Sequence, residues 1–351
     1  MRYRTFGRRT GLRVSELALG AGNFGTGWGH GAERDEAKKI FDGYVEAGGN
    51  FIDTANGYQF GQSEEFVGEF IAADRDDFVL ATKYTLGTTP QDGLSRTGNS
   101  RKNMIQSVEA SLRRLKTDRI DLFWAHFSDG LTPIDEVVRA FDDLVRSGKI
   151  VYVGLSNFPA WRIATAATIA DLRGFSPIAG VQIEYSLVER TPDREILPMA
   201  EAFGLGAALW SPLGGGLLTG KYRKSDEGRL TGLGVVIHTE KTAQDTAVVD
   251  TVLAISEETG ISPTQVSIAW LLHKAAISST SLIPILGPRT REQLDATLGV
   301  LDVTLSPEQI DRLSEVSQVA LGAPHEAINE TAGRIAGGKG SLIDIHDVPV
   351  V

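Results

Sequence analysis

The stretch Asn50-Phe51-Ile52-Asp53-Thr54-Ala55-Asn56-Gly57-Tyr58 is a short apolar run that ends in a carboxylate, with a tyrosine five residues further on. Its first residues are typical of a buried strand, and a glycine-containing loop follows. Two later apolar runs end in a similar way, since residues 77–82 precede Lys83 and residues 120–125 precede His126. An acid, a phenol, an amine and an imidazole at the ends of buried strands form a candidate catalytic cluster.

Size and composition indicate an ordinary globular protein. The chain has 351 residues, of which 42% are hydrophobic and 23% charged. No apolar run reaches the about 18 to 20 residues that cross a bilayer, and the charged start lacks the apolar segment of a secretory signal. The chain has no cysteine, which excludes disulfides, cysteine-ligated zinc and thiol catalysis. We therefore expect a cytoplasmic location and no metal site.

The net charge of -10 argues against nucleic acid or an anionic membrane as the main partner. A small-molecule substrate fits this composition better. The sequence leaves the oligomeric state open.

Strand-like and helix-like segments alternate along most of the chain. Strands are predicted at 16–20, 50–53, 77–83, 120–126, 150–155, 180–184, 205–210 and 281–286, and helices at 34–47, 63–73, 101–116, 133–147, 160–172, 193–203, 246–259, 263–274 and 290–300. Eight strands, each followed by at least one helix, predict an α/β fold of the (β/α)8 TIM-barrel type. Periodicity alone also allows a doubly wound sheet. The regular alternation and the absence of a linker favour one barrel domain over residues 1–351.

The chain ends add smaller elements to this barrel. Residues 2–6 and 13–15 predict a short N-terminal hairpin. Ser262 and Ser306 carry capping-box signals for helices that begin at the following proline, and the second is an extra C-terminal helix. From about residue 320 onward we expect an irregular tail.

Polar side chains gather at the predicted strand ends. In a barrel, active sites lie on the face formed by the C-terminal ends of the strands. The residues on or just past these ends are Asp53, Tyr58, Lys83, His126, Ser156, Asn157, Gln182, Trp210 and Arg289. We expect them to share one face.

The four residues at the second, third and fourth strand exits suit carbonyl chemistry. A free phenol has a pKa of about 10, and a nearby ammonium such as that of Lys83 should lower the pKa of Tyr58. Asp53 can orient Lys83, and His126 can hydrogen-bond a substrate carbonyl. Such a set suits hydride transfer to carbon while Tyr58 protonates oxygen, with the hydride supplied by a nicotinamide cofactor.

Each of these residues also has an ordinary structural interpretation. A loop tyrosine is usually a packing residue, a lysine at a strand end is usually solvated, and a histidine such as His126 can be satisfied in a core. Asp53 before Thr54 can be a turn residue. Their joint occurrence at three consecutive strand exits favours the functional interpretation.

The motif from Asp53 to Tyr58, together with Lys83 and His126, resembles the aldo-keto reductase family. Within that family it resembles the branch of potassium-channel β-subunits and bacterial aldo/keto reductases. The similarity covers nearly the whole chain, including residues 4–15, 148–157 and 210–221. The resemblance implies the barrel, and it implies a catalytic tetrad of Asp53, Tyr58, Lys83 and His126 with Tyr58 as general acid/base.

The resemblance also implies a site for NADP(H). Its residues would be Gly20, Asn23, Asp53, Ser156, Asn157, Gln182, Trp210, Ser211, Leu213, Gly215, Leu217, Lys221, Gly287, Arg289 and Gln293. Ser156, Asn157 and Gln182 would hold the carboxamide, Trp210 would stack on the nicotinamide, and Arg289 would bind the adenosine 2′-phosphate. The loop 211–221 would lie over the pyrophosphate.

The sequence departs from the family pattern beside the adenine site. Ala296 and Thr297 stand where an acidic residue and an asparagine are common, and Thr290 replaces a second basic residue. We still expect NADP(H), and NAD(H) is not excluded.

The leading hypothesis is thus reduction of an aldehyde or ketone to an alcohol, or the reverse. The alternatives are a cofactor-binding regulatory protein of the channel β-subunit type and a lyase that uses Lys83 as a Schiff-base amine. The substrate pocket would be formed by the loops at 23–31, 84–100 and 127–131 and by the tail. Its candidate residues are Trp28, Tyr58, Tyr84, His126 and Phe127. The sequence does not specify the substrate.

Overall fold

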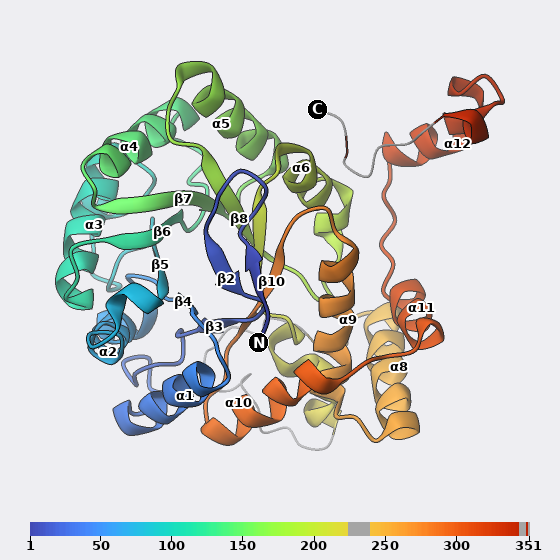
Figure 1. Cartoon of the computed structure of the whole chain (residues 1–351), viewed down its shortest axis with the longest axis horizontal. Helices are drawn as coiled ribbons and strands as arrows, with labels where there is room; N and C mark the ends of the chain where they lie inside the picture. Colours follow the sequence, from blue (N-terminus) through green and yellow to red (C-terminus); the bar gives the residue numbers. More distant parts are fainter. Residues whose placement is uncertain (224–238, 344–348, 350–351) are drawn as a thin grey trace.

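The computed structural model describes residues 1–223, 239–343 and 349. Eight parallel strands close into a barrel in the order β10-β3-β4-β5-β6-β7-β8-β9, which confirms the (β/α)8 prediction and not the doubly wound alternative (Figure 1). The strands are β3 (Ala18–Gly20), β4 (Phe51–Asp53), β5 (Val79–Tyr84), β6 (Ile120–Ala125), β7 (Ile150–Ser156), β8 (Ile178–Glu184), β9 (Gly206–Trp210) and β10 (Leu282–Leu286).

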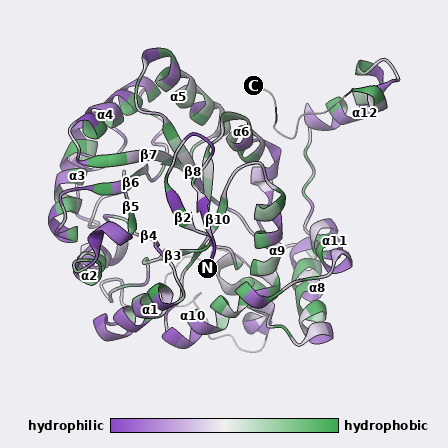
Figure 2. Ribbon diagram, viewed as in Figure 1, coloured by the Kyte–Doolittle hydropathy of each residue, from purple (hydrophilic) through white to green (hydrophobic). Residues whose placement is uncertain are grey.

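Helices surround the barrel, and their hydrophobic and hydrophilic residues alternate in bands along each ribbon (Figure 2). They are α1 (Arg34–Glu46), α2 (Gln62–Phe70), α3 (Arg101–Leu115), α4 (Ile134–Arg146), α5 (Ala160–Arg173), α6 (Ile196–Phe203), α8 (Ala243–Thr259), α9 (Pro263–Ile277), α10 (Arg291–Leu298) and α11 (Pro307–Val316). Capping boxes form at Ser262 and Ser306, as predicted. None of the helices in the described ranges is long and apolar enough to cross a membrane.

The N-terminal hairpin closes one end of the barrel. It consists of β1 (Tyr3–Thr5) and β2 (Arg13–Ser15), and Phe6 follows its first strand. The Phe6 ring lies 5.7 Å from that of Phe51 and 6.2 Å from that of Trp124, centroid to centroid. A Cβ on Gly180 would lie 2.4 Å from the Phe6 ring, so this ring fits only because β8 has a glycine there. The opposite end, where the strands terminate, is left for the site.

The tail differs from the prediction. Residues from about 320 were expected to be irregular, yet α12 (His325–Ile335) is a regular helix. None of its residues is buried, and Ile328 and Ile335 are 52% and 75% exposed. Figure 1 shows α12 projecting from the edge of the molecule. The sequence pattern missed this helix because apolar periodicity reports burial against a core, which α12 lacks.

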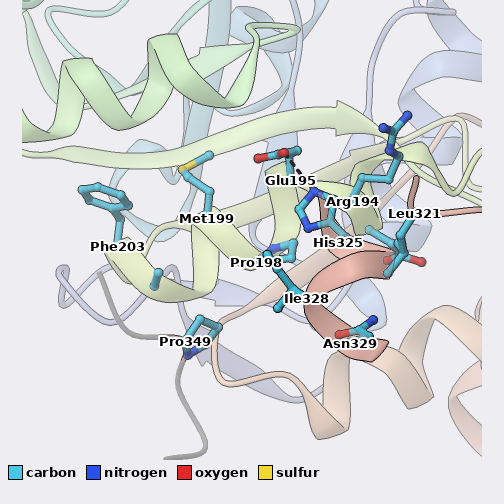
Figure 3. A pocket seen from close by; sticks show the side chains of 12 residues that line it. Arg194, Glu195, Pro198, Met199, Phe203, Leu321, His325, Ile328, Asn329 and Pro349 are labelled. Carbon is cyan, nitrogen blue, oxygen red and sulfur yellow. Dashed lines mark hydrogen bonds and ion pairs between the residues drawn. The ribbon is translucent and has the colours of Figure 1, made fainter. Parts of the chain in front are cut away.

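A pocket on the outer wall of the barrel lies between α6 and α12 (Figure 3). Met199 and Phe203 line it from α6, and Ile328 lines it from α12. His325 Nε2 lies 3.0 Å from the carboxylate of Glu195, just before α6. This pocket contains none of the residues predicted for the active site.

Candidate active site

Strand alternation brings the predicted acid, amine and imidazole to one place. Phe51, Ala81 and Trp124 belong to the cluster that fills the barrel interior. Asp53, Lys83 and His126 each lie two residues beyond one of them, and successive side chains of a strand point to opposite faces. They therefore also point inward, one layer closer to the C-terminal ends of the strands. The register agrees, since Asp53 pairs with Ala81 and Lys83 pairs with Trp124.

Lys83 lies at the centre of this group. Its Nζ is 2.5 Å from Asp53 Oδ2, 2.8 Å from the Thr54 carbonyl oxygen and 3.2 Å from Tyr58 Oη. The exposed fraction is 0% for Lys83 and 3% for Asp53. An ammonium has three N–H donors, and here each has an oxygen within hydrogen-bond distance. The buried charge is thus fully coordinated.

The electrostatics of Lys83 and Tyr58 follow from burial and from each other. Burial acts to lower the pKa of Lys83, but Asp53 and Tyr58 together raise it above its ordinary value, so the amine is protonated. Burial raises the pKa of Tyr58 above 10, and the charge of Lys83 only partly offsets this rise. The expected net lowering of the Tyr58 pKa is therefore wrong. Desolvation of the phenolate raises the pKa more than the Lys83 ammonium lowers it. The negative charge of Asp53 raises the pKa further.

His126 follows β6 and is 9% exposed. Burial, and then the charge of Lys83, hold the pKa of its imidazole well below 6.5, so the ring is neutral near pH 7. Its Nδ1 is buried and has no hydrogen-bond partner among the described residues. The ring centroid lies 5.9 Å from that of Tyr58. A neutral imidazole beside the phenol can donate one hydrogen bond to a substrate oxygen.

The exits of β7, β8 and β9 are tied to this cluster by amide side chains. Asn157 donates from Nδ2 to the His126 carbonyl oxygen (3.0 Å) and to Ser156 Oγ (3.0 Å), and its Oδ1 accepts from Trp210 Nε1 (3.1 Å). Gln182 Nε2 donates to Asp53 Oδ1 (2.9 Å). The predicted carboxamide residues are thus together and joined to the tetrad. In this structure their amide groups bond to other protein groups.

The predicted pyrophosphate loop follows β9. Ser211 has a left-handed φ of 56°, and its Oγ accepts the Gly215 N–H at 2.9 Å. Gly215 is itself left-handed, in the short helix η5 (Gly214–Thr219). Leu217 is buried and Leu213 packs against the core, so these leucines anchor the loop. The Lys221 ammonium lies over the Tyr222 ring, 5.0 Å from its centroid.

The first and last strand exits lie next to each other. Asn23 Nδ2 donates to the Gly287 carbonyl oxygen (2.9 Å). A Cβ on Gly20 would lie 3.0 Å from the Leu286 carbonyl oxygen, so the glycine lets β3 and β10 approach. The structure therefore brings Gly20 and Asn23, two residues assigned to the cofactor site, to the β10 exit.

Arg289 differs from its neighbour Arg291. The Arg291 guanidinium pairs with Glu46 and Asp295. The Arg289 guanidinium has no hydrogen-bond or ion-pair partner within residues 1–223, 239–343 and 349. Gln293, which was assigned to the cofactor site, accepts the Arg289 backbone N–H through its Oε1 at 2.9 Å. It therefore fixes the backbone that presents Arg289.

Two predicted pocket residues flank the cluster. Trp28 meets Tyr58 edge to face with centroids 5.9 Å apart. Phe127 stacks on His126 at 4.8 Å and is 39% exposed. Trp28, Tyr58, His126 and Phe127 therefore form one continuous aromatic array.

Tyr84 does not belong to this array, so its assignment to the pocket is wrong. It is fully buried, stacks on Phe123 at 5.3 Å and donates its hydroxyl to the Asn99 carbonyl oxygen (3.2 Å). It follows Lys83 on an alternating strand, and so it points outward to the helices.

Sequence reasoning missed two polar residues, Thr85 and Asn99, that fix the loops. Thr85 has a φ of 111°, and its Oγ1 accepts from the His126 backbone N–H (3.2 Å) and from Asn99 Nδ2 (2.8 Å). Asn99 also donates to the Phe127 carbonyl oxygen (2.9 Å). Both residues lie in polar loop sequence, where such residues are common. Their partners come from other loops, so the sequence gave no indication of these contacts.

A parallel barrel with a buried Asp–Lys pair, a tyrosine and a histidine at its open end defines a class of barrel enzymes with an acid–base centre. Comparison with known proteins identifies the class more closely. The sequence pattern of the aldo/keto reductase family matches residues 16–318, and the chain belongs to that family. It is an oxidoreductase that acts on carbonyl compounds or alcohols, and members of this family use nicotinamide cofactors.

Three relatives illustrate the similarity. Norsolorinic acid reductase of Aspergillus flavus is 37% identical over 341 residues, which cover 94% of this chain and 84% of that protein. Oxidoreductase YrpG of Bacillus subtilis is 38% identical over 325 residues, 90% of this chain and 96% of that protein. The aryl-alcohol dehydrogenase [NADP(+)] of Phanerodontia chrysosporium is 37% identical over 350 residues, 92% and 88% of the two chains.

The buried pair of Asp53 and Lys83 should contribute to stability as a unit. Removing one partner leaves an uncompensated charge in the barrel, so Lys83→Met and Asp53→Asn should each lower the free energy of unfolding by about 3–5 kcal/mol. The double variant should lose much less than the sum of the two. Urea unfolding of the four proteins measures this difference, and additive losses would show that the two charges are not coupled.

Proposed function

We propose that the chain is an NADP(H)-dependent oxidoreductase that reduces an aldehyde or ketone to an alcohol, or catalyses the reverse, with Tyr58 as general acid/base. One observation carries this proposal. The Tyr58 hydroxyl lies 3.2 Å from the Nζ of a fully buried Lys83, which is itself paired with Asp53. A proton donor beside a fixed positive charge is suited to an oxygen that becomes negative.

These contacts indicate which group donates the proton. The nicotinamide cofactor, when bound, supplies the hydride that reaches the carbonyl carbon. Tyr58 donates its proton to the carbonyl oxygen, which becomes a much stronger base than a phenolate as it gains charge. The raised pKa of Tyr58 keeps the phenol protonated at neutral pH before this step. Lys83 then stabilises the phenolate that remains.

His126 orients the substrate in this scheme. Because its imidazole is neutral, it can hydrogen-bond the carbonyl oxygen without adding a second positive charge beside Lys83. Trp28 and Phe127 would form aromatic walls on either side of Tyr58 and His126. This supports aromatic aldehydes, ketones or alcohols as the substrate class. The aryl-alcohol dehydrogenase relative is named for such a compound.

The residues present fit an NADP(H) cofactor. Ser156, Asn157 and Gln182 would bind the carboxamide, and Trp210 would face the nicotinamide. The glycines after Ser211 let phosphate oxygens come close to the backbone, since a Cβ on Gly216 would already lie 3.2 Å from Lys221 Nζ. Arg289, unlike the ion-paired Arg291, can give its guanidinium to a 2′-phosphate.

Two alternatives fit less well. A Schiff-base mechanism requires a neutral lysine, but Lys83 is held protonated by Asp53. A regulatory protein of the channel β-subunit type is not favoured by the relatives compared, which are named as reductases, dehydrogenases or oxidoreductases.

Tyr58→Phe tests the proposed acid. The variant keeps the ring but lacks the proton, so kcat for an aromatic aldehyde should fall about 100- to 10,000-fold. The NADPH dissociation constant, measured by fluorescence titration, should stay within about threefold of wild type, because Tyr58 is not assigned to the cofactor. Tyr152→Phe, on β7, removes a hydroxyl outside the site and serves as the control. Undiminished turnover by Tyr58→Phe would contradict the assignment.

Arg289→Gln tests the cofactor preference. Loss of one charge-assisted contact should weaken NADPH binding about 10- to 100-fold and leave NADH binding almost unchanged, because NADH lacks the 2′-phosphate. Arg312→Gln is the matched control, since Arg312 pairs with Glu258 on the surface between α8 and α11. Equal weakening of both cofactors by Arg289→Gln would show that Arg289 does not recognise the 2′-phosphate.

A further inference from the structure

The loop between β3 and α1 forms one wall of the site. It closes on itself, because the Gly25 N–H donates to the Ala32 carbonyl oxygen (2.9 Å) and the Ala32 N–H donates to the Asn23 carbonyl oxygen (2.7 Å). Trp28 is carried on this loop and packs against Tyr58. Five of the residues from 22 to 31 are glycines, so the free loop would have high backbone entropy. Trp28 therefore keeps a fixed position only if other contacts hold the loop.

Gln59 is one such contact. It directly follows Tyr58 and is fully buried. Its Oε1 accepts the Trp28 backbone N–H at 2.9 Å, and its Nε2 donates to the Gly22 carbonyl oxygen at 3.2 Å. The backbone at Gln59 has a left-handed φ of 51°, which is uncommon for a residue with a side chain. This turn directs the buried amide toward the loop.

Gln62, in the first turn of α2, makes the second contact. Its Oε1 accepts the backbone N–H groups of Thr26 (2.9 Å) and Gly27 (3.1 Å). The two segments also touch directly, because a Cβ on Gly27 would lie 2.6 Å from the Gln59 carbonyl oxygen. Gln59 and Gln62 together therefore bond to four backbone groups of the loop. Neither residue belongs to the catalytic tetrad.

We propose that Gln59 and Gln62 are positioning residues that hold the 22–31 loop against the Tyr58 segment and so set the wall of the substrate cleft. They act through Trp28 and are assigned neither to the tetrad nor to the cofactor site. Bulky aromatic substrates need a fixed Trp28, whereas a small aldehyde can reach Tyr58 and His126 without it. The two glutamines therefore determine specificity for large substrates. This inference rests on the proposed function for its kinetic consequence, but the contact itself can be tested without activity.

Gln59→Met and Gln62→Met remove the polar contacts at nearly constant side-chain volume. Methionine, unlike glycine, does not make the left-handed φ at residue 59 easier to adopt. Gln309→Met is the matched control, because Gln309 also bonds a backbone N–H, at the start of α11. Hydrogen exchange should become at least about tenfold faster at the Trp28 amide in Gln59→Met, and at the Thr26 and Gly27 amides in Gln62→Met. The control should leave these amides unchanged.

Kinetics then test the effect on specificity. The KM of a substituted benzaldehyde should rise about five- to tenfold in Gln59→Met and Gln62→Met, with the KM of propanal and the NADPH dissociation constant unchanged. Adding Trp28→Ala to either variant should cause little further rise. Gln62 is only partly buried, so Gln62→Met decides the question even where Gln59→Met lowers stability.

The outcomes separate this inference from the proposed function. Wild-type exchange at the loop amides in both variants, or equal KM changes for large and small aldehydes, would overturn the positioning role. If hydrogen exchange is faster in the variants but the wild-type protein reduces no carbonyl compound, the loop contact is supported and the proposed function is rejected.

Discussion

A lysine keeps its charge inside a barrel only if a carboxylate lies beside it, and the pair of Asp53 and Lys83 meets this requirement. The rest of the site is arranged around that pair. Gln182 binds the second oxygen of Asp53, and the Tyr58 hydroxyl takes the third donor of Lys83. Beneath them, apolar side chains that include Phe6, Phe51 and Trp124 fill the barrel, so that the site lies at the opposite end. The charged groups of Asp53 and Lys83 thus lie together at the C-terminal ends of the strands.

The loops around this pair are unusual in backbone conformation. Non-glycine residues with left-handed φ values follow several of the strands, and they are Gln59, Phe60, Thr85, Asn157 and Ser211. Such conformations cost energy and persist only where the surroundings fix them. Side-chain hydrogen bonds provide this here, since Gln59, Asn157 and Ser211 each bond to a neighbouring loop or turn. Hydrogen bonds therefore link several of the loops at the mouth of the barrel.

Much of the fold could be predicted from the sequence, because each barrel strand is an apolar run and each is followed by a helical pattern. The proximity of Asp53, Lys83 and His126 could also be predicted, because these residues end the apolar runs at the point where a barrel opens. Tyr84 was misplaced because it was assigned to the pocket loop at 84–100, whereas it is the last residue of β5, where alternation along the strand turns it outward. The α12 helix gave no signal because it packs on no core. The net pKa of Tyr58 depends on depth of burial, which sequence does not give.

The central claim is that the charge of Lys83, held by Asp53, acts on Tyr58 inside the barrel. The most direct measurement is the pKa of Tyr58, followed through phenolate absorbance and assigned by difference from a protein without the Tyr58 hydroxyl. We predict a wild-type pKa above 10 and a pKa at least about one unit higher in Lys83→Met, because the variant loses the favourable charge and keeps both the burial and the carboxylate of Asp53. An unchanged or lower Tyr58 pKa in Lys83→Met would contradict the account.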